Sequence, residues 1–201
     1  MEKDKKNPNH PRKGSRITVE PIRSEKDIKK IVRRLNDRPR DQLLFLMGIN
    51  NGLRVGDLLK LKVGQVNHLS AGDTLTIKES KTQKDNVLAI NKTVYKVLKQ
   101  YLDANDLEDD DYLFSSRKGK NPLTIQTVNS MVKKWTDEVG LKENYGAHTL
   151  RKTFGYIQRT QFGVGFEVLA KRFNHSSPAV TMRYLGIHDK EVDGILRNEI
   201  G

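Results

Sequence analysis

The chain has no cysteine and no long apolar run. The absence of cysteine excludes disulfides, cysteine-based zinc sites and cysteine nucleophiles, and it fits a reducing compartment. A membrane-spanning helix needs roughly 20 consecutive apolar residues, and no segment approaches that length. The N-terminus is charged and lacks the apolar segment of a signal peptide. We therefore predict a cytoplasmic protein that has no contact with a membrane.

The sequence is also poor in acidic residues relative to basic ones. Its 201 residues include 37 Lys and Arg against 25 Asp and Glu, which gives a formal net charge of +12. So strong a positive balance favours a polyanionic partner, most often a nucleic acid. The alternative is a basic protein that is soluble and has no such partner.

Motifs for cofactors are missing as well. The sequence contains no G-x-x-x-x-G-K-[ST], no G-x-G-x-x-G and no H-E-x-x-H pattern. The five histidines lack the spacing of metal ligands. We predict neither a metal site nor a bound cofactor.

The chain divides into a short leader and one domain. Residues 1–23 are basic, and Pro8, Pro11 and Gly14 interrupt any periodicity, so we predict a disordered tail. This tail is either an arm that contacts DNA phosphates or a solvated leader. Ser24 is a good N-cap and begins the domain, residues 24–201, which is long enough to bury a core.

Apolar periodicity within the domain predicts mainly helices. Helices are expected to begin at Ser24, Pro39 and Thr124, and the apolar run 43–49 indicates a buried helix. Residues 74–77 and 87–90 read as two short strands joined by a polar turn. The fold class is therefore mostly α, with a small antiparallel β-hairpin. The acidic segment 103–111 should face away from any phosphate.

Residues 147–186 hold the side chains that chemistry on a phosphodiester requires. His148 and Arg151 lie three residues apart on one side of a predicted helix, and His175 and Tyr184 follow. Arginine binds phosphate oxygens in a bidentate manner, and histidine moves protons near neutral pH. A tyrosine hydroxyl can form a covalent intermediate. Each residue type alone is more often structural.

Two further cations lie upstream. Arg54 directly follows the predicted buried helix, where it either forms a salt bridge with Asp57 or belongs to a polar site. The polar turn between the two strands carries Lys81 and Lys84, and a hairpin can direct one of them toward DNA. Either lysine is equally compatible with an ordinary solvated turn.

An arginine, a hairpin lysine, His-x-x-Arg, a loop histidine and a tyrosine occur here in the order found in tyrosine recombinases. From about residue 24 to 187, the chain resembles the catalytic domain of this family, the phage-integrase family of DNA breaking–rejoining enzymes. The resemblance implies that Tyr184 attacks the scissile phosphate of double-stranded DNA and forms a 3′-phosphotyrosyl link. The implied roles of the other residues are as follows: Arg54 and Arg151 bind the non-bridging oxygens, His148 is the base or orienting group, His175 donates to the phosphate, and Lys81 protonates the leaving oxygen.

The resemblance also implies partners. Such enzymes act as homotetramers on two paired DNA sites, and we expect this chain to be a monomer when free and to associate with the nucleoid. An accessory protein is a further partner to consider. Cations outside the catalytic set that we assign to DNA binding are Lys84, Arg117, Lys118, Lys120, Lys152 and Arg183.

Three departures from the family pattern stand out. Asp57 replaces the usual glutamate, which changes how Arg54 is held, and Phe173-Asn174-His175 replaces Leu-Gly-His. Asparagine tolerates the left-handed conformation of the missing glycine, so the turn can survive. We also expect no separate core-binding domain, as in short members such as the fimbrial-switch invertases. DNA binding should then be weak and strongly salt-dependent.

Two other functions remain open. A type IB topoisomerase shares the fold and the nucleophile, but His148 favours a recombinase because those enzymes tend to have lysine there. A DNA-binding accessory protein with the same fold and no activity would have no reason to keep the full set of catalytic residues.

Overall fold

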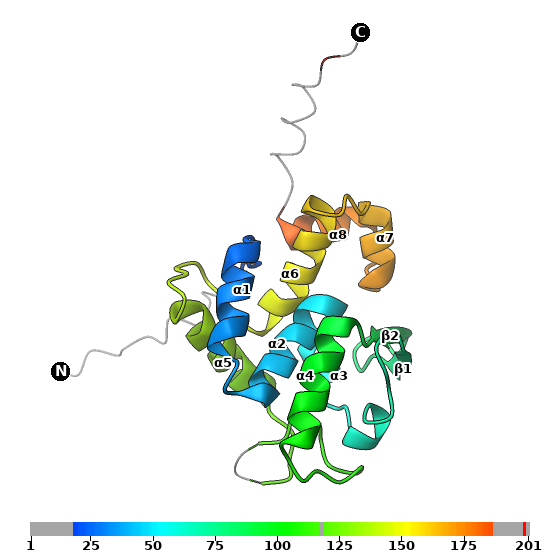
Figure 1. The fold of residues 1–201 in the computed structure, drawn as a ribbon. Helices are drawn as coiled ribbons and strands as arrows, with labels where there is room; N and C mark the ends of the chain where they lie inside the picture. Colours follow the sequence, from blue (N-terminus) through cyan, green and yellow to red (C-terminus); the bar gives the residue numbers. More distant parts are fainter. Residues whose placement is uncertain (1–17, 117–118, 187–198, 200–201) are drawn as a thin grey trace, which may run out of the picture.

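The computed structural model describes residues 18–116, 119–186 and 199 (Figure 1). Within them the order of elements is α1 (Glu25–Arg34), α2 (Pro39–Asn51), α3 (Val55–Leu58), the 3-10 turn η1 (Val63–Gln65), β1 (Thr74–Lys78), β2 (Asp85–Ala89), α4 (Lys92–Asp103), α5 (Ile125–Asp137), α6 (Ala147–Thr160), α7 (Phe166–Arg172) and α8 (Pro178–Leu185). The two strands pair antiparallel, with Thr74 opposite Ala89 and Lys78 opposite Asp85. The prediction of a mostly helical fold with one small hairpin is confirmed.

Helix α2 forms the centre of the main core. The run from Leu43 to Met47 is buried throughout, because α4 and α6 pack on either side of this helix (Figure 1). Trp135 of α5 meets Phe45 of α2 edge to face, with ring centroids 6.0 Å apart. An apolar face on every side of a helix requires such complete enclosure.

Helix starts follow the expected capping chemistry. Ser24 and Thr124 each accept a hydrogen bond from a backbone N–H in the first turn of the following helix, and Pro39 occupies the first turn of α2. The predicted helix starts at these three residues are confirmed.

The predicted domain boundary at Ser24 is too late. Ile22 is only 1% exposed and belongs to the main core, and its N–H donates to the Thr153 hydroxyl at 2.9 Å. Glu20 N–H also donates to the Asn144 carbonyl at 2.8 Å. Residues 18–23 therefore pack as part of the domain, because burial of Ile22 fixes them; residues 1–17 of the predicted tail lie outside the described residues.

A second, smaller core lies at one end of the molecule, where α7 and α8 pack against α6 (Figure 1). Its buried residues are Phe166, Leu169, Phe173 and Leu185. The loop between α7 and α8 carries His175, and α8 carries Tyr184. The segment that holds the predicted nucleophile thus has its own hydrophobic core.

No helix in the described part of the chain is both long enough and apolar enough to cross a bilayer.

The end of α2 offers a test of packing. Gly52 has a φ of +60°, and a Cβ there would lie 2.3 Å from Phe154 Cδ1. We expect Gly52→Ala to lower the free energy of unfolding by roughly 2–5 kcal/mol, the sum of left-handed strain and overpacking. Urea denaturation measures this loss. Gly163→Ala is the matched control, since Gly163 has a φ of +66° and no atom within 4 Å of the added Cβ. Equal losses in the two variants would contradict the steric argument.

Candidate active site

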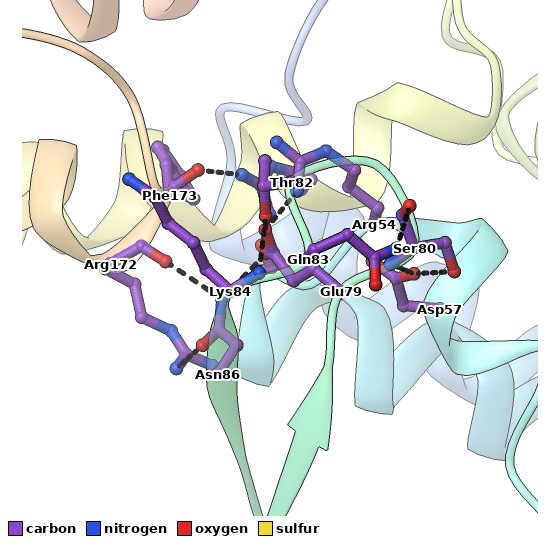
Figure 2. A network of polar contacts seen from close by, with 12 residues as sticks. Arg54, Asp57, Glu79, Ser80, Thr82, Gln83, Lys84, Asn86, Arg172 and Phe173 are labelled. Carbon is purple, nitrogen blue, oxygen red and sulfur yellow. Dashed lines mark hydrogen bonds and ion pairs between the residues drawn. The ribbon is translucent and has the colours of Figure 1, made fainter.

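Arg54 immediately follows the turn that ends α2 and is the N-cap residue of α3. Its Nη1 donates to Glu79 Oε2 at 2.5 Å (Figure 2). The alternative salt bridge between Arg54 and Asp57 is therefore wrong. Arg54 keeps part of its surface exposed, so donors other than Nη1 remain accessible at the pocket while Glu79 fixes the guanidinium.

Glu79 was not singled out from the sequence, yet it anchors the network in Figure 2. Its side chain is fully buried and also accepts from Thr82 Oγ1 at 2.6 Å and Asn86 Nδ2 at 2.8 Å. Burial raises the pKa of Glu79, but the hydrogen bonds from Thr82, Asn86 and Arg54 outweigh it and bring the pKa to about 2. The missed signal is the alternation of strand β1, which turns Leu75, Ile77 and then position 79 toward the interior.

Asp57 does not bind Arg54; it binds the hairpin turn. Its Oδ1 accepts from both the N–H and the Oγ of Ser80, at 2.9 Å and 2.7 Å (Figure 2). Ser80 precedes Lys81, so the shorter carboxylate fixes the backbone from which Lys81 projects. In this chain the partner of Arg54 is thus Glu79, and Asp57 binds the hairpin at Ser80.

Lys81 and Lys84 occupy different places on the turn. Lys81 is exposed and lines a pocket of about 340 Å³ together with Arg54, His148 and Arg151. Lys84 is also exposed but is not among the residues that line this pocket. The geometry favours Lys81 as the lysine that meets a phosphate bound there.

Helix α6 supplies the His-x-x-Arg pair. Arg151 is only 2% exposed; its Nη1 donates to the Gly52 carbonyl at 2.6 Å and its Nη2 to the Phe173 carbonyl at 2.7 Å. It is thus more enclosed than the helical pattern indicated. His148 is exposed at the pocket, but nearby protein atoms displace water and lower its pKa, and the charges of Arg151 and Arg54 lower it further. A neutral imidazole at pH 7 can accept a proton.

His175 lies next to Tyr184, with ring centroids 5.2 Å apart. Asn174 has a φ of +51°, so asparagine adopts the left-handed turn expected in place of glycine. His175 Nδ1 and the buried Thr181 hydroxyl form a hydrogen bond of 2.9 Å, which fixes the ring. Burial, reinforced by the charge of Arg151, lowers the pKa of His175 to about 4.

The Tyr184 hydroxyl is buried and makes no hydrogen bond of normal length and angle to the described residues. Its ring packs edge to face on Phe173, with centroids 5.8 Å apart, and Lys152 Nζ lies 5.1 Å from the ring centroid. Burial raises the pKa of Tyr184 to about 12, although the charges of Arg151 and Arg54 act in the opposite direction. In this arrangement the phenol is protonated at neutral pH.

The cations predicted to bind DNA are dispersed. Lys152 is buried beneath Tyr184, whereas Arg183 is exposed on α8. Lys120 lies 3.5 Å from Glu108 and 3.6 Å from Asp111, in the acidic segment that repels phosphate. Its place as a DNA contact is thus the least supported by geometry. Arg117 and Lys118 lie outside the described residues.

The arrangement brings Arg54, Lys81, His148 and Arg151 to one pocket, and Arg151 reaches from there to the segment that carries His175 and Tyr184. Two guanidinium groups and an ammonium group form a site for a phosphate, and neutral imidazoles next to a phenol allow proton transfer. Within the described residues, no three His, Asp, Glu or Cys side chains gather in a way that could hold a metal ion.

Known proteins are similar to this chain in sequence. Residues 23–191 match the model of the phage integrase family. The chain is 37% identical over 174 residues to the probable integrase/recombinase YoeC of Bacillus subtilis, which covers 85% of this chain and 91% of that protein. It is 32% identical over 171 residues to the tyrosine recombinase XerA of Pyrococcus horikoshii, covering 84% of this chain but 58% of that relative.

Solved structures agree on the fold. The crystal structure of XerA recombinase superposes with a TM-score of 0.73 at 22% identity, over 92% of this chain and 68% of that one. The XerH recombinase in a post-cleavage complex with a palindromic difH substrate gives a TM-score of 0.72 at 20% identity, over 90% of this chain and 53% of that one. With the family model matched across most of its length, this chain belongs to the phage integrase family and has the fold of a tyrosine recombinase catalytic domain.

Proposed function

We propose that this chain is a site-specific DNA recombinase that cleaves and rejoins double-stranded DNA through a 3′-phosphotyrosyl intermediate. The observation that carries the proposal is the convergence of Arg54, Lys81, His148 and Arg151 on one pocket. Arg151 also binds the Phe173 carbonyl, beside the ring of Tyr184. The names of the relatives, integrase/recombinase and tyrosine recombinase, support the same class of reaction.

The phosphate is bound first. Arg54 and Arg151 donate to the non-bridging oxygens and stabilise the negative charge that grows on them in the transition state. Arg151 already directs two of its five N–H groups at carbonyls, and three remain for the phosphate. Because protein contacts fix both guanidinium groups before DNA arrives, little reorganisation accompanies the reaction.

Cleavage then exchanges one ester bond for another. The Tyr184 oxygen bonds to phosphorus, the bond from phosphorus to the 5′ oxygen breaks, and Lys81 donates a proton to that oxygen. The phenol proton passes to a neutral imidazole, His148 being the base and His175 a donor to the phosphate. Tyr184 needs this help since its pKa is raised to about 12 in the free protein. A 5′-hydroxyl from the partner duplex reverses the steps, so the ester energy is retained.

A nicked suicide duplex tests the proposal, with sequences taken from the ends of the DNA element or gene neighbourhood that encodes the chain. We expect a protein–DNA adduct that survives denaturing electrophoresis, and peptide mass spectrometry should place the nucleotide on Tyr184. An adduct on another tyrosine would contradict the assigned nucleophile. Binding without any adduct would favour the accessory-protein function, for which the buried and unpaired Tyr184 hydroxyl is the supporting observation.

A sulfur substitution identifies the catalytic lysine. Lys81→Ala should lose cleavage of ordinary DNA by about 10²–10⁴-fold, the usual contribution of a general acid. A duplex with sulfur in place of the bridging 5′ oxygen should restore the rate, because a thiolate leaves without a proton. Lys84→Ala is the matched control: at protein concentrations that saturate the DNA, it should cleave both substrates at the wild-type rate. If Lys84→Ala, and not Lys81→Ala, cleaves only the duplex with the bridging sulfur, then Lys84 is the residue that protonates the leaving oxygen.

We further propose that the chain is a monomer when free and assembles as a homotetramer on two DNA sites at the cell's nucleoid. The exposed Lys84 and Arg183 assist in binding DNA, whereas the buried Lys152 does not. Affinity should be weak and fall steeply with salt, because phosphate contacts release counterions. Arg183→Ala should reduce the slope of log affinity against log salt by about 1. Lys120→Ala should leave the slope unchanged, since Lys120 already contacts Glu108 and Asp111. Fluorescence anisotropy across a salt series measures both slopes, and a flat dependence in the wild type would contradict the prediction.

A further inference from the structure

The two halves of the candidate site belong to different hydrophobic cores. Helices α7 and α8 with the loop between them, residues 166–185, are here called the nucleophile unit; it carries His175 and Tyr184 and has its own small core. Arg54 instead begins α3, whose buried residues belong to the main core. Helix α6 contributes to both cores, and its Arg151 donates to the Phe173 carbonyl, which is one connection between the two halves. A second connection lies at the end of α7.

Arg172, the last residue of α7, joins the two halves. Its Nε and Nη2 donate to the Asn51 carbonyl at 3.1 Å and 2.5 Å, and Nη2 also donates to the Val87 carbonyl at 2.8 Å. Its Nη1 donates to Asn86 Oδ1 at 2.6 Å. Asn51 ends α2, where unpaired carbonyls carry partial negative charge that attracts a cation. The planar guanidinium suits several acceptors at once.

The connection continues to the phosphate site. Asn86 is 7% exposed, and its Nδ2 donates to Glu79 Oε1 at 2.8 Å, while Glu79 Oε2 accepts from Arg54. In Figure 2 the Arg172 side chain meets Asn86 at the hairpin, and Glu79 lies between Asn86 and Arg54. A contiguous chain of hydrogen bonds thus links the nucleophile unit with the first catalytic arginine.

We propose that Arg172 is a positioning residue for strand cleavage: it fixes the nucleophile unit against the end of α2 and the hairpin so that Tyr184 meets the phosphate held by Arg54. The inference rests on the proposed function. Arg172 does not act as a catalytic residue, because protein acceptors occupy each of its three nitrogens.

The expected effect is on rate and not on affinity. A displacement of about 1 Å at a reacting group slows a reaction by about 10²-fold. Arg172→Met, which keeps an unbranched apolar stem and removes the guanidinium donors, should slow single-turnover cleavage of the suicide duplex about 100-fold at saturating protein. DNA affinity should match that of the control Lys171→Met, which removes the same charge from an exposed neighbour on α7.

Two readouts separate positioning from general loss of stability. Free guanidinium ion, at concentrations far below those that unfold proteins, should restore part of the rate in Arg172→Ala, and equal potassium chloride should not. Hydrogen exchange without DNA should rise in residues 166–185 of Arg172→Met and stay unchanged in α2 and α4. If Arg172→Met fails to fold, Asn86→Ala removes a single link and should show the same selective loss of rate.

The inference would be overturned if Arg172→Met cleaved at the wild-type rate. It would also be overturned if Arg172→Met and Lys171→Met lost the same fraction of the cleavage rate. Hydrogen exchange decides independently of the reaction. If the wild type forms no adduct, the proposed function fails. Unchanged hydrogen exchange in residues 166–185 of Arg172→Met would then show that Arg172 does not fix the nucleophile unit. Selectively raised hydrogen exchange in those residues would show that Arg172 does fix it.

Discussion

Replacing Tyr184 by phenylalanine should abolish the covalent adduct and at the same time stabilise the fold. The adduct disappears because no other atom of the side chain can attack phosphorus. The fold gains because the lost hydroxyl is buried without a hydrogen bond of normal geometry, and an unsatisfied buried polar group costs about 1–3 kcal/mol. The nearby Arg151 side chain, which acts to lower the pKa of Tyr184, offsets part of that cost but does not reverse the sign. The aromatic contacts with Phe173 and His175 remain. Denaturing electrophoresis and urea unfolding measure the two effects.

Tyr145→Phe is the matched control for Tyr184→Phe. Tyr145 is also buried, but its hydroxyl donates to Glu143 Oε2 at 2.6 Å. Losing that bond should destabilise the protein by about 1 kcal/mol, the opposite sign to Tyr184→Phe, and should leave cleavage intact. Adduct formation by Tyr184→Phe would remove Tyr184 as the nucleophile. A lower free energy of unfolding in Tyr184→Phe would mean that the hydroxyl has a partner in solution.

Glu79→Gln should destabilise the fold by roughly 3 kcal/mol and greatly slow cleavage, because removing one member of a buried ion pair leaves the other uncompensated. An amide has only one acceptor oxygen, whereas the Glu79 carboxylate accepts from Arg54, Thr82 and Asn86 through two. Urea unfolding and single-turnover cleavage measure the losses. Glu108→Gln is the control and should change stability by less than about 1 kcal/mol, since its contact with Lys120 is exposed.

The ionisation of Glu79 should make the free energy of unfolding depend on pH in the acid range. The folded pKa is about 2 against an ordinary value of 4.5, so the unfolded chain takes up a proton first as the pH falls. The stability from this carboxylate, at most about 3 kcal/mol, is complete above pH 4.5 and lost as the pH falls toward 2. The stability difference between wild type and Glu79→Gln should shrink over that range. A difference independent of pH would refute the assigned ionisation.

The sequence predicted the parts of the site that local patterns determine. His148 and Arg151 share one side of a helix because they lie three residues apart, and Asn174 substitutes for glycine because it tolerates a positive φ. Strand alternation predicted the hairpin itself. These features depend on a few neighbouring residues and need no knowledge of the tertiary structure.

The network around Glu79 could not be read in the same way. Asn86, Arg172 and the end of α2 are distant in sequence, and their contact depends on how α7 packs against the hairpin. The burial of Tyr184 also depends on tertiary packing, here on Phe173 and on Lys152. Charge patterns likewise placed Lys120 on a DNA surface, because the acidic partners Glu108 and Asp111 meet it only in the folded chain.

The contacts of arginine side chains with the end of α2 have a consequence for the turnover of defective variants. Arg151 and Arg172 bind consecutive carbonyls there, those of Gly52 and Asn51, so site residues contribute directly to the folded state. Active-site groups more often reduce stability, and variants that lose them persist as inactive proteins. Here a chain that loses the buried Arg151 also loses two hydrogen bonds to backbone carbonyls, so we expect it to unfold more often and to become a better substrate for cellular proteases. We therefore expect copies defective at Arg151 to be degraded rather than to accumulate as folded, inactive protein.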